Sequence, residues 1–275
     1  MKLVVLSDNR SKDGLLETEH GLCIYLETST HKWLLDTGAS DLFIRNAEKL
    51  NIALEEVDFV FISHGHADHI GGLASFLELN SKAKVFLSEY AIIERFFSSR
   101  AGKKEIGISL DLEKYGHRLS FIKKNMHVGS DVLIFSDSSH SFPVPEANRM
   151  LYSDKVDGID QDDFKHELFI CFGTEELLVY TGCAHKGLLN MLDAIERGTE
   201  KPVSKLIGGF HLPDSTESLL FETEEGLSVI GTELQTNYPH THFITGHCTG
   251  SHAFNQLKEK LQERIVWFYT GYSIE

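Results

Sequence analysis

The stretch HGHADHIGG at residues 64–72 places four metal-binding side chains within six positions: His64, His66, Asp68 and His69. Neutral imidazole and carboxylate are ligands that zinc, manganese and iron accept. Four such ligands do not all fit around one catalytic ion that keeps an open position, whereas two ions about 3.5–4 Å apart can share them. The stretch therefore predicts two metal ions, each of which needs further ligands from elsewhere in the chain.

Three more histidines stand in glycine-containing turns, each directly after a predicted strand. They are His185 in TGCAHKG, His211 in GGFHL and His247 in TGHCTG. A buried, hydrogen-bonded histidine without a metal would account for any one of them. Three such positions in one chain favour metal or substrate binding instead.

The elements that must position these residues alternate between strands and helices. An almost wholly apolar strand at 57–63 runs directly into the histidine cluster, which predicts burial on both faces. The strands predicted before the later histidines span 177–181, 204–207 and 241–245. The predicted helices span 73–79, 89–97, 187–197, 216–236 and 252–264. Strands early and late in the chain, with helices between them, suit two sheets packed together with helices outside.

The chain contains no linker rich in Pro, Gly and Ser, which predicts a single domain over residues 1–275. Residues 98–116 and 137–166 are rich in Gly, Ser and Asp and have weak periodicity, so we expect them to cover the site. The acidic run at 157–163 lacks the complete spacing of a calcium loop and is interpreted as a solvated loop. His166, just after it, has no assigned role.

Composition limits the partners. The formal net charge is −15, which repels nucleic acid. This charge does not exclude a small anionic substrate, because the metal ions would hold it locally. No apolar run approaches the roughly 18 residues that span a bilayer. The apolar run near the start, Leu3 to Leu6, is too short for a signal peptide, so a cytoplasmic location is expected. The oligomeric state is left open, a homo-oligomer included.

The motifs resemble a known family. HGHADHIGG is similar to the HxHxDH signature of the metallo-β-lactamase superfamily, and LLDTG at 34–38 resembles the strand and turn that precede it. Together with TGCAHKG, IGGFHL and GHCTG, these motifs resemble the subfamily of the archaeal dihydropterin-methyl-(ribofuranosyl)aminobenzene-phosphate synthase and related metal-dependent hydrolases. This resemblance implies an α/β fold, a four-layer αββα sandwich, with the site at one rim of the sheets.

The resemblance also implies roles for single residues. It gives one metal the ligands His64, His66 and His185, and the other the ligands Asp68, His69 and His247. The ions are expected to be Zn²⁺, with Mn²⁺ or Fe²⁺ as alternatives. His211 is then the proton donor or a substrate contact, although His211 and His247 could exchange roles. Asp36 at a strand end is expected to accept a ring N–H and fix the tautomer of a ligand. Cys183 stands where many members have a metal-bridging Asp, and we favour a supporting role for it without metal contact.

These features predict a binuclear metal-dependent hydrolase that acts through a metal-bound hydroxide on a phosphoester or related ester, with Asp68 orienting the hydroxide. One alternative is a synthase or transferase that displaces pyrophosphate from a pterin diphosphate. A second is di-iron oxygen reduction, although such proteins usually carry Glu at the position of His66 and need a flavin domain. A third is a non-catalytic metal-binding protein.

Overall fold

The structure is a computed structural model that describes residues 1–12, 14–155 and 158–275. The chain divides into two compact units, each with its own large sheet. Unit 1 comprises Met1–Lys123, Leu151–Leu168 and Phe268–Glu275, and unit 2 comprises Lys124–Met150 and Phe169–Trp267. The prediction of a single domain stays a prediction.

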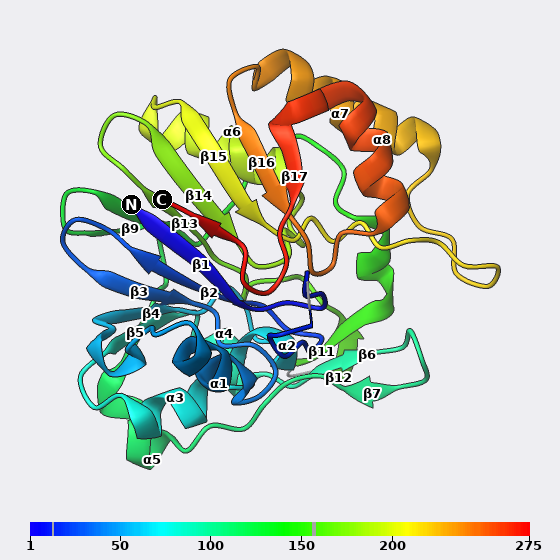
Figure 1. The fold of residues 1–275 in the computed structure, drawn as a ribbon. Coiled ribbons are helices and arrows are strands. Elements are labelled where there is room, and N and C mark those ends of the chain that lie inside the picture. Colours follow the sequence, from blue (N-terminus) through cyan, green and yellow to red (C-terminus); the bar gives the residue numbers. More distant parts are fainter. Residues whose placement is uncertain (13, 156–157) are drawn as a thin grey trace. The chain divides into compact units, whose positions relative to one another are not determined.

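Unit 1 contains a seven-stranded sheet in the order β18-β1-β2-β3-β4-β5-β8, whose strands Figure 1 labels in part. The strands are β1 (Lys2–Ser7), β2 (Cys23–Glu27), β3 (Lys32–Leu35), β4 (Phe59–Phe61), β5 (Lys84–Leu87), β8 (Leu119–Phe121) and β18 (Ser273–Ile274). Strands β3, β4, β5 and β8 run parallel to one another, and the remaining pairs are antiparallel. Most residues of β3, β4 and β5 are buried, as the nearly continuous apolar sequence of such strands requires, whereas Phe121 of the edge strand β8 is exposed.

Helices of unit 1 cover one face of this sheet. They are α1 (Leu42–Lys49), α2 (Ala67–Ile70), α3 (Leu73–Leu79), α4 (Tyr90–Ile93) and α5 (Leu112–Tyr115), with 3₁₀ turns η1 (Leu54–Glu56) and η2 (Gly116–Arg118). Phe43 of α1 and Phe76 of α3 are fully buried in one cluster with Leu34 and Val60. Leu34 of β3 and Val60 of β4 are paired neighbours, so their side chains lie on the same face of the sheet. Helix α3 has the bounds predicted from the sequence.

A small four-stranded sheet in unit 1, in the order β12-β11-β6-β7, replaces much of the predicted loop structure. Its strands are β6 (Phe96–Ser98), β7 (Lys104–Glu105), β11 (Leu151–Lys155) and β12 (Gly158–Gln161). The predicted helix at 89–97 is wrong in its second half, because Phe96 and Phe97 pair with Ser153 and Tyr152 of β11. Residues 156–157, within the expected cover segment and acidic run, lie outside the described residues.

Unit 2 contains the second seven-stranded sheet, in the order β17-β16-β15-β14-β13-β10-β9. The strands are β9 (Met126–Val128), β10 (Val132–Phe135), β13 (Phe169–Phe172), β14 (Leu177–Thr181), β15 (Val203–Gly208), β16 (His242–Thr245) and β17 (Ile265–Trp267). Strands β14 to β17 are parallel neighbours, and Figure 1 shows them side by side in sequence order. The strand predictions at 177–181 and 241–245 are confirmed to within one residue.

The helices of unit 2 pack on this sheet through one apolar stripe each. They are α6 (Leu188–Thr199), α7 (Glu224–Asn237) and α8 (Ser251–Leu261), with 3₁₀ turns η3 (Glu146–Met150) and η4 (Gln262–Arg264). The prediction of one helix over 216–236 is wrong before residue 224, because Thr223 caps α7 by accepting the N–H of Gly226 at 3.1 Å. In the described part of the chain, no helix is both long and apolar enough to cross a membrane.

Candidate metal centre

In unit 1, the loops that carry the histidine cluster begin at one edge of the parallel strands. Leu35 at the end of β3 pairs with Phe61 of β4, and the N–H of Asp36 donates to the carbonyl of Phe61 at 2.8 Å. Because parallel strands end at the same edge, Asp36 and the loop from Ser63 to His69 meet there. A side chain at Gly72 would collide with the backbone carbonyls of Thr37 and Ser40, so glycine permits this close approach.

The Asp36 carboxylate organises two of the predicted ligands. Its Oδ2 atom accepts hydrogen bonds from Nδ1 of His69 at 2.7 Å and from the Ser63 hydroxyl at 2.6 Å, and its Oδ1 accepts the Ser63 N–H at 2.6 Å. Since the Ser63 hydroxyl donates to Asp36, it accepts from Nδ1 of His64, at 2.9 Å. Both imidazoles therefore hold their proton on Nδ1 and carry the lone pair on Nε2. The predicted role of Asp36 as acceptor of a ring N–H is confirmed.

The other two predicted ligands of this loop lie at the start of α2. The His66 ring centroid is 4.7 Å from that of His64, and the Asp68 Oδ2 atom is 3.9 Å from Nε2 of His69. His20, which the sequence analysis did not single out, places Nε2 3.2 Å from the same Asp68 oxygen. The N–H of Ala67 donates to the carbonyl of Ile106, so the segment 98–116 contacts this loop.

Burial sets the protonation of the central histidine. His64 is completely buried, and burial lowers its pKa well below the ordinary value. The neighbouring rings of His69, His66 and His166 lower the pKa of His64 further, against an opposing effect of Asp68. A neutral imidazole is the form that binds a metal ion.

A histidine and an aspartate that sequence reasoning left out lie behind this loop in unit 1. Nδ1 of His166 accepts the N–H of Gly65 at 2.9 Å, and Nε2 of His166 donates to Asp162 Oδ2 at 3.0 Å. The interpretation of 157–163 as a solvated loop is wrong for Asp162, which is 6% exposed. Burial raises the pKa of Asp162, but His166 and His66 outweigh that effect and hold the pKa well below its usual range. The i, i+4 spacing of Asp162 and His166 was the available signal.

In unit 2, three turns leave one sheet edge in register. Thr181 of β14, Gly208 of β15 and Thr245 of β16 pair across adjacent parallel strands. The turns after these residues hold the candidates His185, His211 and His247. The register of the strands therefore places these histidines at one edge of the sheet, although 62 positions of sequence separate His185 from His247. A side chain at Gly208 would collide with the carbonyl of Thr181, and the φ of Gly208 is +147°.

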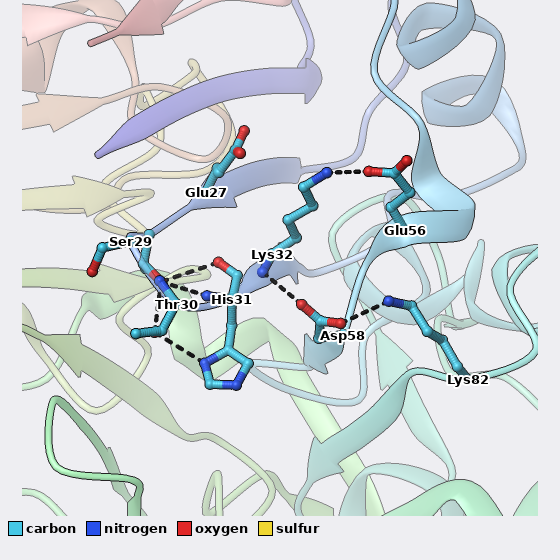
Figure 2. Close-up of a pocket in the computed structure, with 9 residues that line it drawn as sticks. Glu27, Ser29, Thr30, His31, Lys32, Glu56, Asp58 and Lys82 are labelled. Atoms are coloured by element: carbon cyan, nitrogen blue, oxygen red, sulfur yellow. Dashed lines mark hydrogen bonds and ion pairs between the residues drawn. The ribbon is translucent and has the colours of Figure 1, made fainter.

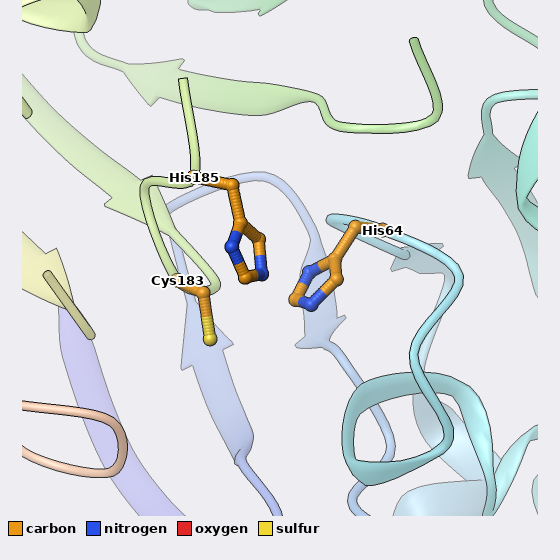
Figure 3. Close-up of side chains that lie close together, drawn as sticks. All are labelled: His64, Cys183 and His185. Atoms are coloured by element: carbon orange, nitrogen blue, oxygen red, sulfur yellow. The ribbon is translucent and has the colours of Figure 1, made fainter. Parts of the chain in front are cut away.

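The turn after β14 presents two candidate side chains. Figure 3 shows Cys183 and His185 in this turn, and it shows His64 in the loop after β4 of unit 1. Asn148 of η3 holds His185 twice: its Oδ1 accepts from Nδ1 at 3.1 Å, and its amide N–H donates to the His185 carbonyl at 2.7 Å. The proton of His185 therefore lies on Nδ1, as in His64 and His69. No sequence signal marked Asn148, which lies 37 residues away.

The turns after β15 and β16 bring His211 beside two cysteines. The His211 ring centroid is 4.1 Å from that of His185, and the His211 N–H donates to Cys248 Sγ at 3.2 Å. Donor atoms of Cys183, His211 and Cys248 all lie within 4.8 Å of one another. Burial raises the pKa of Cys248, but Cys183, His211 and the charge of His247 lower it on balance. Cys248 is a potential soft ligand that sequence reasoning missed.

Backbone strain concentrates in these loops. In the described ranges, eight non-glycine residues have left-handed φ values, and five of them belong to the loops above: Asp36, Phe164, Ala184, His211 and His247. Each such conformation costs about 1–3 kcal/mol and persists where surrounding contacts enforce it. That cost is typical of functional sites.

The donor chemistry fits divalent metal ions. Three predicted ligands, His64, His69 and His185, have Nδ1 bound to an oxygen acceptor and the lone pair on Nε2. This is the arrangement that metal-binding histidines adopt in proteins. Donor atoms of Asp36, His64 and His69 also lie within 4.8 Å of one another, but the Asp36 oxygens accept hydrogen bonds from Ser63 and His69, so Asp36 supports the ligands.

A cavity of about 320 Å³ lies elsewhere in unit 1, at the turn between β2 and β3. Figure 2 shows its ion pairs, between Lys82 and Asp58 at 2.7 Å and between Lys32 and Glu56. Its lining contains none of the predicted ligands. Both of its lysines are already paired with carboxylates.

Comparisons with known proteins define the class. Residues 17–93 match the family model of the metallo-β-lactamase superfamily. A solved metal-dependent hydrolase of the β-lactamase superfamily is 28% identical to this chain, with a TM-score of 0.81 over 100% of this chain and 98% of that one. The human short-form tRNase Z has a TM-score of 0.54 over 100% of this chain and 99% of that one, and at 9% identity it shows likeness of fold alone.

A curated relative gives a second, functionally different comparison. It is the 7,8-dihydropterin-6-methyl-4-(β-D-ribofuranosyl)-aminobenzene-5′-phosphate synthase of Methanocaldococcus jannaschii. The two chains are 24% identical over 269 residues, which cover 92% of this chain and 89% of the relative. The fold is thus α/β, of the type found in a superfamily of metal-dependent enzymes. Residues 17–93 therefore match the metallo-β-lactamase superfamily, which is the family that the sequence motifs resemble.

Proposed function

We propose that this protein is a hydrolase that holds two divalent metal ions, Zn²⁺ in the first instance with Mn²⁺ or Fe²⁺ as alternatives. The proposed ligands are His64, His66 and His185 for one ion, and Asp68, His69 and His247 for the other. The ligand sets follow the superfamily pattern, and the similarity to a metal-dependent hydrolase over the whole chain supports the reaction class.

The observation that carries the proposal is the hydrogen-bond network around Asp36. One buried carboxylate binds His69 directly and His64 through Ser63, so a hydrogen bond at Nδ1 orients each ring and leaves the lone pair on Nε2. Burial of the Asp36 carboxylate is costly. If these histidines served only for packing, nothing would offset that cost. Preorganised ligands are what a catalytic metal site requires.

When bound, two divalent ions would lower the pKa of water toward about 7 and would polarise an ester or phosphoryl oxygen. The chain's own residues would do the rest. Asp68 Oδ2 lies 3.2 Å from Nε2 of His20, and in the proposal the Asp68 carboxylate orients the attacking water. His211 is 5% exposed and lies against His185, which suits a proton donor to the leaving group.

The proposed substrate is a small anionic ester, a phosphoester above all. A net charge of −15 disfavours nucleic acid, so the attraction must be local. The segments 98–116 and 137–166 contact the loops of the candidate ligands, through Ile106 in unit 1 and Asn148 in unit 2. In the proposal these segments set specificity, and the protein acts in the cytoplasm without a membrane or nucleic-acid partner.

Metal analysis and a substrate panel test the proposal together. The purified protein should contain two metal ions per chain, located by anomalous scattering, and should hydrolyse phosphodiesters or phosphomonoesters faster than thioesters or lactams. The His64→Ala variant should lose metal and activity together, whereas His31→Ala, which changes an exposed histidine of the β2–β3 turn, should lose neither. One metal per chain at saturation, or hydrolysis that survives metal removal, would contradict the proposal.

A synthase is the second candidate, because the curated synthase matches 92% of this chain. In that reaction an aromatic nucleophile would displace pyrophosphate from a pterin diphosphate. Release of pyrophosphate that depends on the aromatic co-substrate would establish the synthase, and release that proceeds with water alone would establish the hydrolase.

A further inference from the structure

Asp162 and His166 form a buried hydrogen-bonded pair that the proposed reaction does not use. His166 is fully buried, and Asp162 is 6% exposed. The His166 ring centroid lies 4.2 Å from that of Phe96, with the two rings tilted by 40°, and it lies 5.3 Å from that of His66 and 5.9 Å from that of His64. A buried carboxylate is costly unless donors surround it, and Asp162 accepts hydrogen bonds from His166 and from the Phe164 backbone.

The direction of each hydrogen bond in the pair is determined. The N–H of Gly65, between His64 and His66, donates to Nδ1 of His166, so the proton of His166 is on Nε2. That Nε2–H donates to Asp162 Oδ2. The second oxygen of Asp162, Oδ1, accepts the N–H of Phe164, whose left-handed φ of +54° turns the chain between the two residues.

The same Asp162 oxygen faces the predicted ligand His66. Nε2 of His66 lies 3.8 Å from Asp162 Oδ2, which is beyond hydrogen-bond length by less than 1 Å. If Nε2 of His66 donates its proton to this carboxylate, Nδ1 is the ring nitrogen that carries the lone pair for a metal ion. His66 thus differs from His64 and His69, whose Nδ1 atoms face the supporting oxygens.

We propose that Asp162 and His166 are positioning residues for the metal ligand His66: His166 fixes the loop at Gly65, and Asp162 accepts the Nε2–H of His66 so that Nδ1 binds the metal ion. This inference rests on the proposed function. A carboxylate that accepts the second ring N–H of a ligand orients the ring and raises its basicity. A backbone hydrogen bond also joins the segment that carries His166 to the loop that carries His66, since the Leu168 N–H donates to the carbonyl of Ser63 at 2.7 Å.

The Asp162→Asn variant tests the role with little change in shape. Its amide oxygen can still accept the Phe164 N–H, but its NH₂ group presents a donor where His166 and His66 both need an acceptor. Asp163→Asn is the matched control, because Asp163 adjoins Asp162 but pairs with the surface residues Lys155 and Lys165. Zn²⁺ affinity of the folded protein is measured by competition with a chelating dye, and unfolding of the metal-free protein by calorimetry.

We expect Asp162→Asn to weaken binding of Zn²⁺ by about 10–100-fold, the usual effect of losing such a partner, and Asp163→Asn to leave it unchanged. A lower unfolding temperature with unchanged Zn²⁺ affinity would mean a purely structural role and would overturn the inference while the proposed function stands. Absence of Zn²⁺ binding by the wild-type protein would overturn both.

Nitrogen NMR of the metal-free protein gives a readout that does not depend on metal. We expect His166 to be the Nε2–H tautomer in the wild-type protein and in Asp163→Asn. An Nδ1–H tautomer in the wild-type protein would contradict the hydrogen bond from Gly65 and overturn the positioning role.

Discussion

Asp36 Oδ2 lies 2.7 Å from Nδ1 of His69, and both side chains are fully buried. In a buried site this contact fixes which nitrogen of His69 carries the proton, because no water competes for the carboxylate. The same oxygen accepts from Ser63 and through it controls His64. One carboxylate that contacts no metal in the proposed site therefore governs two of its ligands.

Asp36→Asn should weaken metal binding without unfolding the protein. Asparagine tolerates the left-handed backbone of this position, where φ is +56°, but it cannot accept from Ser63 N–H, Ser63 Oγ and His69 together. We expect the Zn²⁺ affinity to fall about 10–100-fold and the free energy of unfolding to fall by about 1–3 kcal/mol. Chelator competition and denaturant unfolding measure the two effects. The exposed Asp41→Asn change is the control, and an equal loss there would contradict the prediction.

Cys183→Ser and His185→Ala should separate a supporting residue from a ligand. Cys183 lies two residues before His185 in the turn after β14. Asn148 accepts the Nδ1–H of His185 and so orients this ring as a ligand. We expect Cys183→Ser to keep both metal ions and most activity, and His185→Ala to lose at least one ion. Metal content by mass spectrometry is the measurement. Loss of metal in the serine variant, or a metal–sulfur distance near about 2.3 Å in a crystal structure, would make Cys183 a ligand.

Removal of the His211 imidazole should reduce turnover and leave metal content intact. A group that donates a proton to the leaving group contributes about 10²–10⁴-fold, so His211→Ala should slow kcat by that factor. Because the φ of His211 is +49°, His211→Asn is the better-tolerated companion variant and should show the same loss. If either variant lacks one metal ion while folded, His211 and His247 have exchanged roles.

Glu222 should make the protein less stable as the pH rises. Burial, and secondarily the Glu146 charge, raise the pKa of Glu222 above its ordinary value of 4.5, against the N–H of Glu146 and the Arg149 charge. The folded state then keeps a proton that the unfolded state loses, so stability falls as the pH rises from about 4.5 through the folded-state pKa. Glu222→Gln removes this loss.

Denaturant unfolding of the metal-free protein at pH 4.5 and pH 7.5 measures the effect. The stability of Glu222→Gln relative to wild type should be greater at the higher pH. Glu217→Gln, an exposed residue of the same segment, should show no such pH dependence. An equal difference at both pH values would contradict a raised pKa of Glu222.

Local patterns determined much of the fold and the candidate ligands. The helix 73–79 and the strand 177–181 were predicted to the residue, because hydrophobic periodicity and flanking glycines are local properties of the sequence. The HGHADH motif likewise needed no tertiary information, since four ligand-type side chains in six positions have few other uses. Asp36 was identified for the same reason, as a carboxylate at a strand end beside a histidine cluster.

Tertiary structure decided which residues hold those ligands. Phe96 and Phe97 lie in a strand and not a helix because β11, more than 50 residues later, pairs with them. Asn148 supports His185 across 37 positions, and His166 supports Gly65 across 101. Asp162 reads as a solvated acidic residue by composition and is buried in the folded chain. Sequence spacing specifies which residue types can bind a metal, whereas the proton position on each ring depends on hydrogen-bond partners that only the folded backbone brings within reach.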